Sequence, residues 1–329
     1  MKVARAKKVA MAAFFLFLIG LNMSQIGLLP SNSITKDFWQ TLENGKPNRG
    51  KTLPYSKANL LAHQHSFGLF HNISNANWDV LRLKTKTTSW YGNPDDPLKN
   101  VGNASYWNRH NMNPNFQCPV LEKMGDKGRG ETKFVCNPQR LAYARKKSGC
   151  LIYSVGSAGD FSFEDAIFNL HGRDCEIHVF DTANWERSGD VEKKNIHYHT
   201  WGLLSTYDSS KSVVWPKGRS GGFKTFPETL DLLGHRNRTI DVFNIDCEGC
   251  KWSTIKDWIG FDIRQILIEM HGVPTPAGTP KARWYQEPLN MSDYYQHYID
   301  NGYALFNKDP NGELSLELCF IKLHNDFWN

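Results

Sequence analysis

The sequence predicts an α/β fold in which a mostly parallel sheet of seven strands ends in a C-terminal antiparallel hairpin. From Cys150 onward, short β-favouring runs alternate with segments of helical spacing. Strands separated by helices require right-handed crossovers, which give a parallel sheet covered on both faces. The last two β-favouring runs are instead separated by turn-forming residues. The 329 residues, 40% of them hydrophobic, are enough to bury such a core.

The elements follow in order along the chain. Five short apolar runs predict the parallel strands, at 151–156, 175–180, 196–204, 240–245 and 265–270. Helical spacing predicts the helices, at 161–170 with Asp160 and Ser162 as N-cap candidates, 226–233 with a capping box of Thr225 and Glu228, 252–259 and 292–300. The hairpin pairs 303–307 with 314–323 around the turn formers Asp309, Pro310, Asn311 and Gly312.

The first 30 residues have the pattern of a targeting signal. Four basic residues precede an apolar run over 9–21, which polar residues interrupt before apolar character resumes at 26–29. The short run fits a cleaved signal peptide, whereas the longer stretch fits an uncleaved signal anchor. The anchor is favoured because no small-residue cleavage site follows Leu21. We therefore expect a single-pass type II membrane protein with a lumenal domain in the endoplasmic reticulum or Golgi, or alternatively a secreted protein.

The rest of the chain agrees with a lumenal setting. Glycosylation sequons begin at Asn72, Asn103, Asn237 and Asn290. In an oxidising compartment some of the seven cysteines should form disulfides, and the odd number leaves one free or paired elsewhere. The net charge of +6 is spread along the chain, so we expect no nucleic-acid partner.

Three regions are expected: the signal segment 1–30, a stem and extension over 31–148, and the α/β domain 149–329. The extension is polar and has no sustained apolar period, although it contains several tryptophans and the pair Cys118 and Cys136, which are candidates to close a loop. The tryptophans are Trp39, Trp78, Trp90 and Trp107. Packing of the extension onto the domain is the favoured interpretation, and lining of an acceptor site is the alternative.

A ligand site is expected where the parallel strands end, beside the first strand. Gly156, Ser157 and Gly159 form the first strand-to-helix turn, where small residues let the backbone approach a nucleoside and its amino-acid tail. Asp181 closes the second strand, where a carboxylate accepts hydrogen bonds from two ribose hydroxyls. The dinucleotide motif G-x-G-x-x-G is absent from this turn, so we do not expect a pyrophosphate there.

Several of these segments together resemble a known family. The segments 150–164, 175–181, 241–252 and 265–271, with the closing 317–323, resemble the methyltransferase-like family of the methyltransferase-like protein 24 type. The more distant FkbM-type methyltransferases share the D-x-E-G element. The resemblance implies a Rossmann-like, seven-stranded S-adenosylmethionine-dependent methyltransferase fold over about 149–329, with S-adenosyl-L-methionine as cofactor. It implies no particular acceptor, and we expect a glycan or a protein.

The chain departs from many methyltransferases at Ser154, where they place an acid that contacts the methionine amino group. Glu164 or Asp246 is the substitute that we expect. Methyl transfer to a hydroxyl also needs a base to take the proton. Asp246 and Glu248, after the fourth strand, and His271, at the end of the fifth, are the catalytic candidates.

Two patterns resemble metal sites, but we predict no metal at either of them. Cys247 and Cys250 form a C-x-x-C without a second one, which favours a disulfide or packing over zinc. His197 and His199 share a strand face, and a polar face is the favoured interpretation.

Two alternative functions remain from the sequence. One is a lumenal type II glycosyltransferase, with a metal held by the D-x-E element at 246–248. The other is a methyltransferase-fold protein without catalytic activity.

Overall fold

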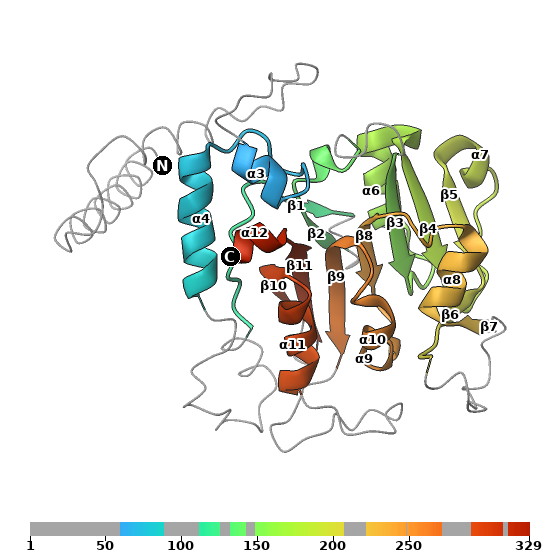
Figure 1. The fold of residues 1–329 in the computed structure, drawn as a ribbon. Coiled ribbons are helices and arrows are strands. Elements are labelled where there is room, and N and C mark those ends of the chain that lie inside the picture. Colours follow the sequence, from blue (N-terminus) through green and yellow to red (C-terminus); the bar gives the residue numbers. More distant parts are fainter. Residues whose placement is uncertain are drawn as a thin grey trace, which may run out of the picture. The chain divides into compact units, whose positions relative to one another are not determined.

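The chain was examined as a computed structural model, which describes residues 60–88, 112–125, 132–142, 149–206, 222–247, 249–271, 291–311 and 315–329. Residues 55–329 form one compact unit. Its centre is a seven-stranded sheet in the order β10-β11-β9-β8-β3-β4-β5 (Figure 1). The strands are β3 (Cys150–Val155), β4 (Cys175–Phe180), β5 (Ile196–His199), β8 (Ile240–Ile245), β9 (Ile263–His271), β10 (Tyr303–Asn311) and β11 (Ser315–Lys322).

The pairing of these strands confirms the predicted fold class. β3 pairs in parallel with β4 and β8, β4 with β5, and β8 with β9. β11 runs antiparallel to both β9 and β10, so the last strand inserts between them. This arrangement is the mostly parallel sheet with a C-terminal antiparallel hairpin that the sequence predicts.

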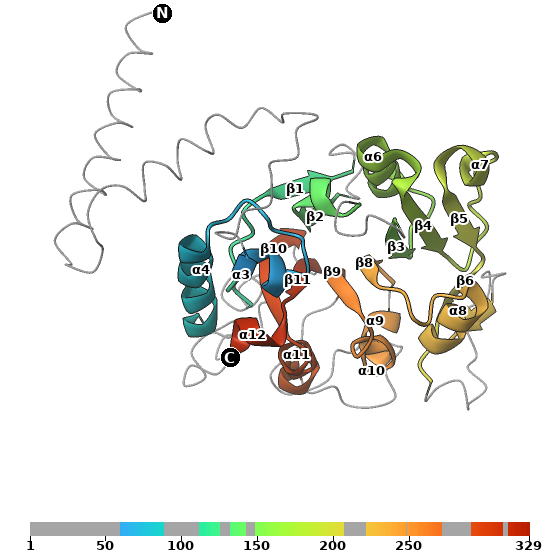
Figure 2. The same ribbon diagram turned by 45° about the horizontal axis from the view of Figure 1, so that its top comes forward.

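Both faces of the sheet are buried, because alternate residues of each strand enter different cores. In β3, Cys150 and Ile152 belong to one core, whereas Leu151, Tyr153 and Val155 belong to the other. The two sets of covering elements lie on opposite sides of the sheet in Figure 2. One side carries α8 (Phe226–Leu233), α9 (Cys250–Ser253), α10 (Ile255–Trp258) and α11 (Met291–Asp300), and the other carries α6 (Ser162–His171) and the elements before residue 149.

The predicted capping box of α8 is confirmed. The Thr225 hydroxyl accepts the Glu228 backbone N–H, and the Glu228 carboxylate accepts the Thr225 N–H. Gly234, at φ 70°, ends the helix in the left-handed region. Smaller elements complete the domain, namely η4 (Gly172–Asp174), α7 (Asp190–Lys194) and α12 (Asn325–Trp328).

The third predicted strand is wrong in its extent. β5 ends at His199, and β6 (Trp201–Leu203) pairs with β7 (Gly222–Lys224) in a separate two-stranded sheet. The chain bends at Thr200, whose carbonyl accepts the Gly222 N–H. An apolar run shows where strands form but does not show where the backbone leaves a sheet.

Two other predicted bounds also differ. The helix predicted over 252–259 is two short helices, α9 and α10. The turn formers Asp309, Pro310 and Asn311 extend β10 and pair with β11. Pro310 is tolerated there because β10 lies at the edge of the sheet.

The region predicted as an irregular extension contains regular elements. These are α3 (Leu60–His65), α4 (Asn75–Thr87), β1 (Leu121–Met124), β2 (Lys133–Cys136) and η2 (Pro138–Arg140). Trp78 is fully buried, and its indole N–H donates to His65 Nδ1 at 2.8 Å. Trp78 and other buried apolar residues of this region share one core with β3 and α6. This is what we expect if the extension packs onto the domain. The division at residues 148 and 149 stays a prediction.

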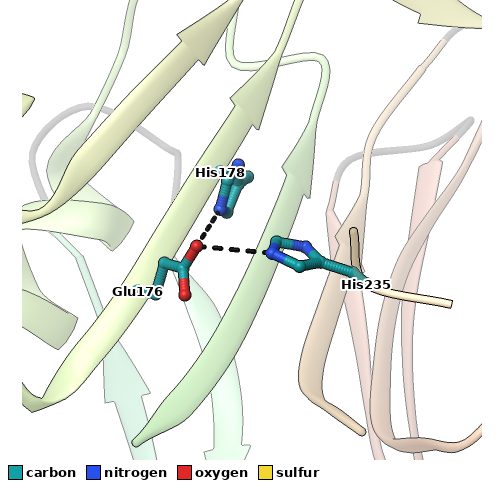
Figure 3. Close-up of side chains that lie close together, drawn as sticks. All are labelled: Glu176, His178 and His235. Atoms are coloured by element: carbon teal, nitrogen blue, oxygen red, sulfur yellow. Dashed lines mark hydrogen bonds and ion pairs between the residues drawn. The ribbon is translucent and has the colours of Figure 1, made fainter. Parts of the chain in front are cut away.

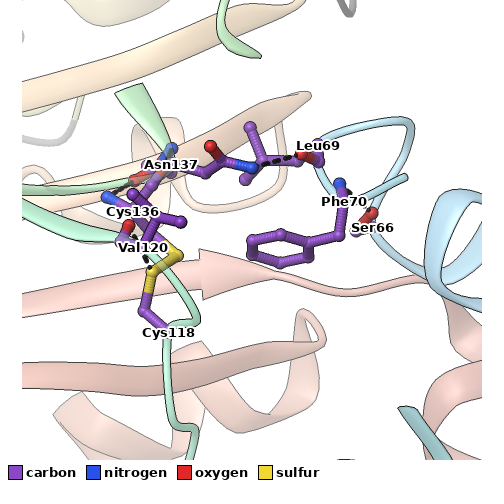
Figure 4. The surroundings of a disulfide bond; sticks show 8 residues. Ser66, Leu69, Phe70, Cys118, Val120, Cys136 and Asn137 are labelled. Carbon is purple, nitrogen blue, oxygen red and sulfur yellow. Dashed lines mark hydrogen bonds between the residues drawn. A yellow bond between two sulfur atoms is a disulfide. The ribbon is translucent and has the colours of Figure 1, made fainter. Parts of the chain in front are cut away.

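Side-chain contacts hold the β1–β2 hairpin on the sheet. The predicted pair Cys118 and Cys136 forms a disulfide, and the amide of Asn137 donates to the Leu69 carbonyl at 2.7 Å (Figure 4). The Gln265 side chain of β9 bonds to both backbone groups of Cys136. β2 therefore lies at a fixed place beside β9.

The described residues bear on some of the lumenal expectations. Asn72 and Asn237 are exposed. Cys150 pairs with Cys175 and Cys247 with Cys250, while Cys319 is a buried thiol. The segment 1–30 and the residues Trp39, Trp90, Trp107, Asn103 and Asn290 lie outside the described part of the chain. No helix in that part is long and apolar enough to cross a membrane.

Candidate functional site

The glycine turn after β3 lies where the parallel strands end. Gly156 has φ 86°, and its N–H donates to the Phe180 carbonyl. A Cβ at Gly156 would overlap the carbonyl oxygen of Asp246, which follows β8. The close approach of the backbone after β8 therefore requires glycine at position 156, whether or not a ligand also approaches the turn.

Asp181 contacts this turn directly, as the fold geometry predicts. Its Oδ2 accepts the Ala158 N–H and its Oδ1 accepts the Ala183 N–H, both at 2.9 Å. Each carboxylate oxygen has a second lone pair. Asp181 therefore orders the glycine turn and retains acceptor capacity for a ligand.

Trp185, which the sequence analysis missed, lies against the same turn. A Cβ at Gly159 would come within 2.9 Å of its ring. The small pocket beside it has a volume of about 10 Å³ and is lined in part by Ser157, Asp181, Trp185 and His199. That volume holds about one water. Trp185, which lines this pocket, is 44% exposed.

Glu164, in the first turn of α6, is buried beneath the glycine turn with 1% of its surface exposed. The Glu164 side chain forms a hydrogen bond with the Ser154 hydroxyl. The Ser154 hydroxyl oxygen also accepts a hydrogen bond from the Asn244 amide at 3.1 Å. Among the described residues, Glu164 Oε2 and Asn244 Oδ1 have no hydrogen-bond partner. Burial raises the pKa of Glu164 to about 7, against the effect of the Ser154 bond. Two unpartnered buried oxygens on residues that both bond Ser154 fit a ligand that donates hydrogen bonds.

Asp246, after β8, belongs to a buried charge cluster. Lys133 of β2 lies 3.2 Å from Asp246 Oδ2, 3.0 Å from Glu269 Oε2 and 2.6 Å from Glu317 Oε1. Burial would lower the pKa of Lys133, but the three carboxylates outweigh it and raise that pKa. Burial raises the pKa of Asp246 and brings that of Glu317 to about 7, although Lys133 opposes both shifts.

The sequence analysis missed Lys133, Glu269 and Glu317. The signal was a single acid inside each of two otherwise apolar runs, at 266–270 and 316–321. A buried strand carries a charge only where an opposite charge meets it. That cation comes from the extension, which the sequence analysis separated from the catalytic domain.

The other catalytic candidates are less fully described. Glu248 lies outside the described residues. The backbone of His271 ends β9 opposite Ser315 of β11, and its side chain is not described. The Cys247–Cys250 pair forms a disulfide, which confirms that interpretation over zinc.

Comparisons with known proteins identify the class of the fold. A family model described as a methyltransferase domain matches residues 60–322. The solved structure of the 16S rRNA methylase ArmA is 11% identical and has a TM-score of 0.25, with 56% of this chain and 79% of that chain covered. OxaC, solved in complex with SAH and oxaline, is 13% identical with a TM-score of 0.27, covering 56% of this chain and 46% of that one. The identities and TM-scores of these two structures are too low to indicate what this chain binds.

No curated protein matches the chain. The family match covers well over half of its length, and it includes the extension that supplies Lys133. The relation to FkbM-type methyltransferases stays a prediction. The chain thus belongs to a family of methyltransferase domains, enzymes that take a methyl group from S-adenosylmethionine.

Proposed function

We propose that S-adenosyl-L-methionine binds across the glycine turn, with its ammonium group against Glu164 and its ribose against Asp181. The observation that carries this proposal is the unpartnered, buried Oε2 of Glu164. Asn244, which like Glu164 bonds the Ser154 hydroxyl, also has an unpartnered buried oxygen. An ammonium group has three donors and a positive charge, so it satisfies both oxygens and stabilises the ionised form of Glu164. Glu164 thereby replaces the acid that this family fold commonly has at the position of Ser154.

The remaining contacts follow from the turn. Asp181 holds Ala158 with one lone pair of Oδ2, which leaves lone pairs on both oxygens for two ribose hydroxyls. Gly156, Ser157 and Gly159 leave room for the amino-acid tail to approach the backbone. The adenine would lie beside the Trp185 ring, which packs against Gly159.

Asp246 is the general base that we favour for the acceptor, with Glu248 and His271 as alternatives. The bound cofactor supplies an electrophilic methyl group, and an acceptor oxygen or nitrogen must lose a proton. Burial raises the pKa of Asp246, which makes its carboxylate a stronger base than an exposed one. Lys133 fixes the position of that carboxylate through the 3.2 Å contact.

Calorimetry with S-adenosylhomocysteine on the full chain tests the cofactor site. We expect one equivalent to bind, and Glu164→Gln to weaken binding at least tenfold because the charge opposite the ammonium is lost. Glu186→Gln is the matched control, since Glu186 is exposed and outside the turn contacts. Absence of binding to the unmodified chain, or equal affinity in Glu164→Gln, would contradict the proposed site.

We propose further that the enzyme works in the lumen of the secretory pathway, with a glycan or a protein as acceptor. Support comes from the disulfides among the described residues and from the exposed sequon residues Asn72 and Asn237. Digestion with an N-glycosidase should increase the gel mobility of chain made in a eukaryotic secretory system. Unchanged mobility would count against this location. Mass spectrometry for methylated glycans and proteins lost on gene deletion would identify the acceptor.

A further inference from the structure

Glu176, His178 and His235 form a cluster on the opposite side of the sheet from Glu164. Glu176 and His178 lie on β4, and His235 follows the C-terminal end of α8 (Figure 3). One ligand atom of each lies within 4.8 Å of the other two. His178 and His235 are each only 4% exposed.

The three side chains converge on one carboxylate oxygen. His178 Nε2 lies 2.8 Å from Glu176 Oε1, and His235 Nε2 lies 3.4 Å from the same oxygen. Ligand atoms that bind tetrahedral zinc at about 2.0–2.1 Å stand roughly 3.3 Å apart. The second distance already fits, the first would have to open by about half an ångström, and all three ligand atoms lie within 4.8 Å of one another.

The far nitrogen of each imidazole has its own partner. His235 Nδ1 lies 2.8 Å from the Tyr153 hydroxyl, and His178 Nδ1 lies 2.8 Å from His199 Nε2. If each Nδ1 carries the proton and donates it, the lone pair of each Nε2 faces Glu176. Metal-binding histidines are oriented by such outer hydrogen bonds. This sequence therefore supplies both the ligands and the groups that orient them.

We infer that Glu176, His178 and His235 bind a divalent transition-metal ion, for which zinc is the best match. Two imidazoles and one carboxylate are a common zinc ligand set that leaves a position for water. Arg238 donates to Glu176 Oε2 and leaves Oε1 for the metal.

The site is separate from the proposed cofactor site. Glu176 is the second residue of β4, whereas Asp181 follows the last one, which places them about 16 Å apart along the strand. The ion would join β4 to the segment between α8 and β8. Its effect would be to stabilise the folded domain by binding it preferentially. The inference therefore holds or fails independently of the proposed function.

Zinc titration of the full, untagged chain after chelator treatment tests the site. We expect one equivalent of Zn²⁺, a rise in Tm on binding, and with Co²⁺ the visible absorption of a tetrahedral or five-coordinate site. Glu176→Gln and His235→Ala should each weaken zinc binding at least tenfold. His197→Ala is the matched control, because His197 stacks on His178 at 4.8 Å but its Nε2 lies 3.0 Å from Asn195 Oδ1.

One further variant distinguishes a metal site from a hydrogen-bonded cluster. Arg238 Nη1 lies 3.1 Å from His235 Nε2, so it competes for the same lone pair and repels a cation. Arg238→Met should bind zinc at least as tightly as the unmodified chain. Less than a tenth of an equivalent of zinc in the unmodified chain, or unchanged affinity in Glu176→Gln, would overturn the inference. Should His235→Ala fail to fold by circular dichroism, the nearly isosteric Glu176→Gln still decides it.

Discussion

Lys133 Nζ lies 3.2 Å from Asp246 Oδ2, although 113 residues separate the two in the sequence. Lys133 is 2% exposed and also contacts Glu269 and Glu317, so it links three carboxylates. A second buried cation, Lys251 of α9, donates to the Glu269 carbonyl and lowers the pKa of Asp246. The β1–β2 hairpin therefore supplies a charge partner to the residue that follows β8, in addition to covering the sheet.

Lys133→Met should destabilise the domain by about 3–5 kcal/mol, because removal of one partner leaves buried charges uncompensated. Urea unfolding near pH 7.5 measures this free energy. Lys123→Met is the control: its ion pair with Asp309 is about one-third exposed, and exposed pairs contribute about 0–1 kcal/mol. Similar losses in the two variants would contradict the role given to Lys133. Adding Glu317→Gln to Lys133→Met should restore part of the stability.

The sequence predicted the elements that are continuous apolar runs. The bounds of β4 and β8 match their predictions, because both strands are rich in β-favouring residues and are buried along almost their whole length. Helices α3 and α4 were missed, since they are polar and rest on a few anchors such as Trp78. Periodicity detects an apolar stripe, and it does not detect a helix fixed by one buried aromatic residue.

The sequence predicted residues of the candidate site only where the fold class alone fixes the position of a residue, such as the end of a strand. Asp181 and the glycine turn are neighbours because β3 and β4 are adjacent parallel strands, whereas the ribose contact of Asp181 stays a prediction. The link from Lys133 to Asp246 was not predictable, because it joins elements that only the tertiary fold brings together. Trp185 was missed because it lies in a loop, where the sequence has no periodic pattern.

Gly156→Ala should destabilise the domain by at least about 2 kcal/mol. The left-handed φ of 86° disfavours any side chain, and the new Cβ would overlap the Asp246 carbonyl. Gly260→Ala is the control, because nothing lies within 4 Å of its Cβ position. Thermal unfolding of both variants gives the comparison, and an unchanged Tm for Gly156→Ala would refute the steric argument.

Asp181→Ala should weaken S-adenosylhomocysteine binding by about ten- to a hundredfold while the domain stays folded. The variant loses the proposed ribose contacts and also the bond that orders Ala158. Asp160→Ala separates these effects: Asp160 bonds the Ser162 N–H in the same loop at 2.8 Å but has no proposed ligand contact. Calorimetry on both variants makes the comparison. Equal losses of affinity would indicate that loop order, and not the ribose contact, sets the affinity.

Glu164 should make stability depend on pH between about 4.5 and 7. Its pKa is about 7 in the folded domain against an ordinary 4.5, with burial as the main cause. Within this interval the folded chain keeps a proton that the unfolded chain releases, so stability falls as pH rises. At about 1.4 kcal/mol per pH unit, the loss amounts to roughly 3 kcal/mol by pH 7 and then stays constant.

Glu164→Gln cannot ionise, so it should be more stable than the unmodified chain above pH 7 and should show a shallower pH dependence. Part of the slope should remain, because the pKa of Glu317 is also raised to about 7. Urea unfolding from pH 5 to 8, with the exposed Glu186→Gln as control, measures both slopes. Cofactor binding has the opposite dependence: the ionised Glu164 holds the ammonium, so affinity for S-adenosylhomocysteine should rise from pH 6 to 8 only where Glu164 is present. Parallel pH profiles in the two proteins would remove Glu164 from the cofactor site, since a buried group that merely packs cannot change the affinity in this way.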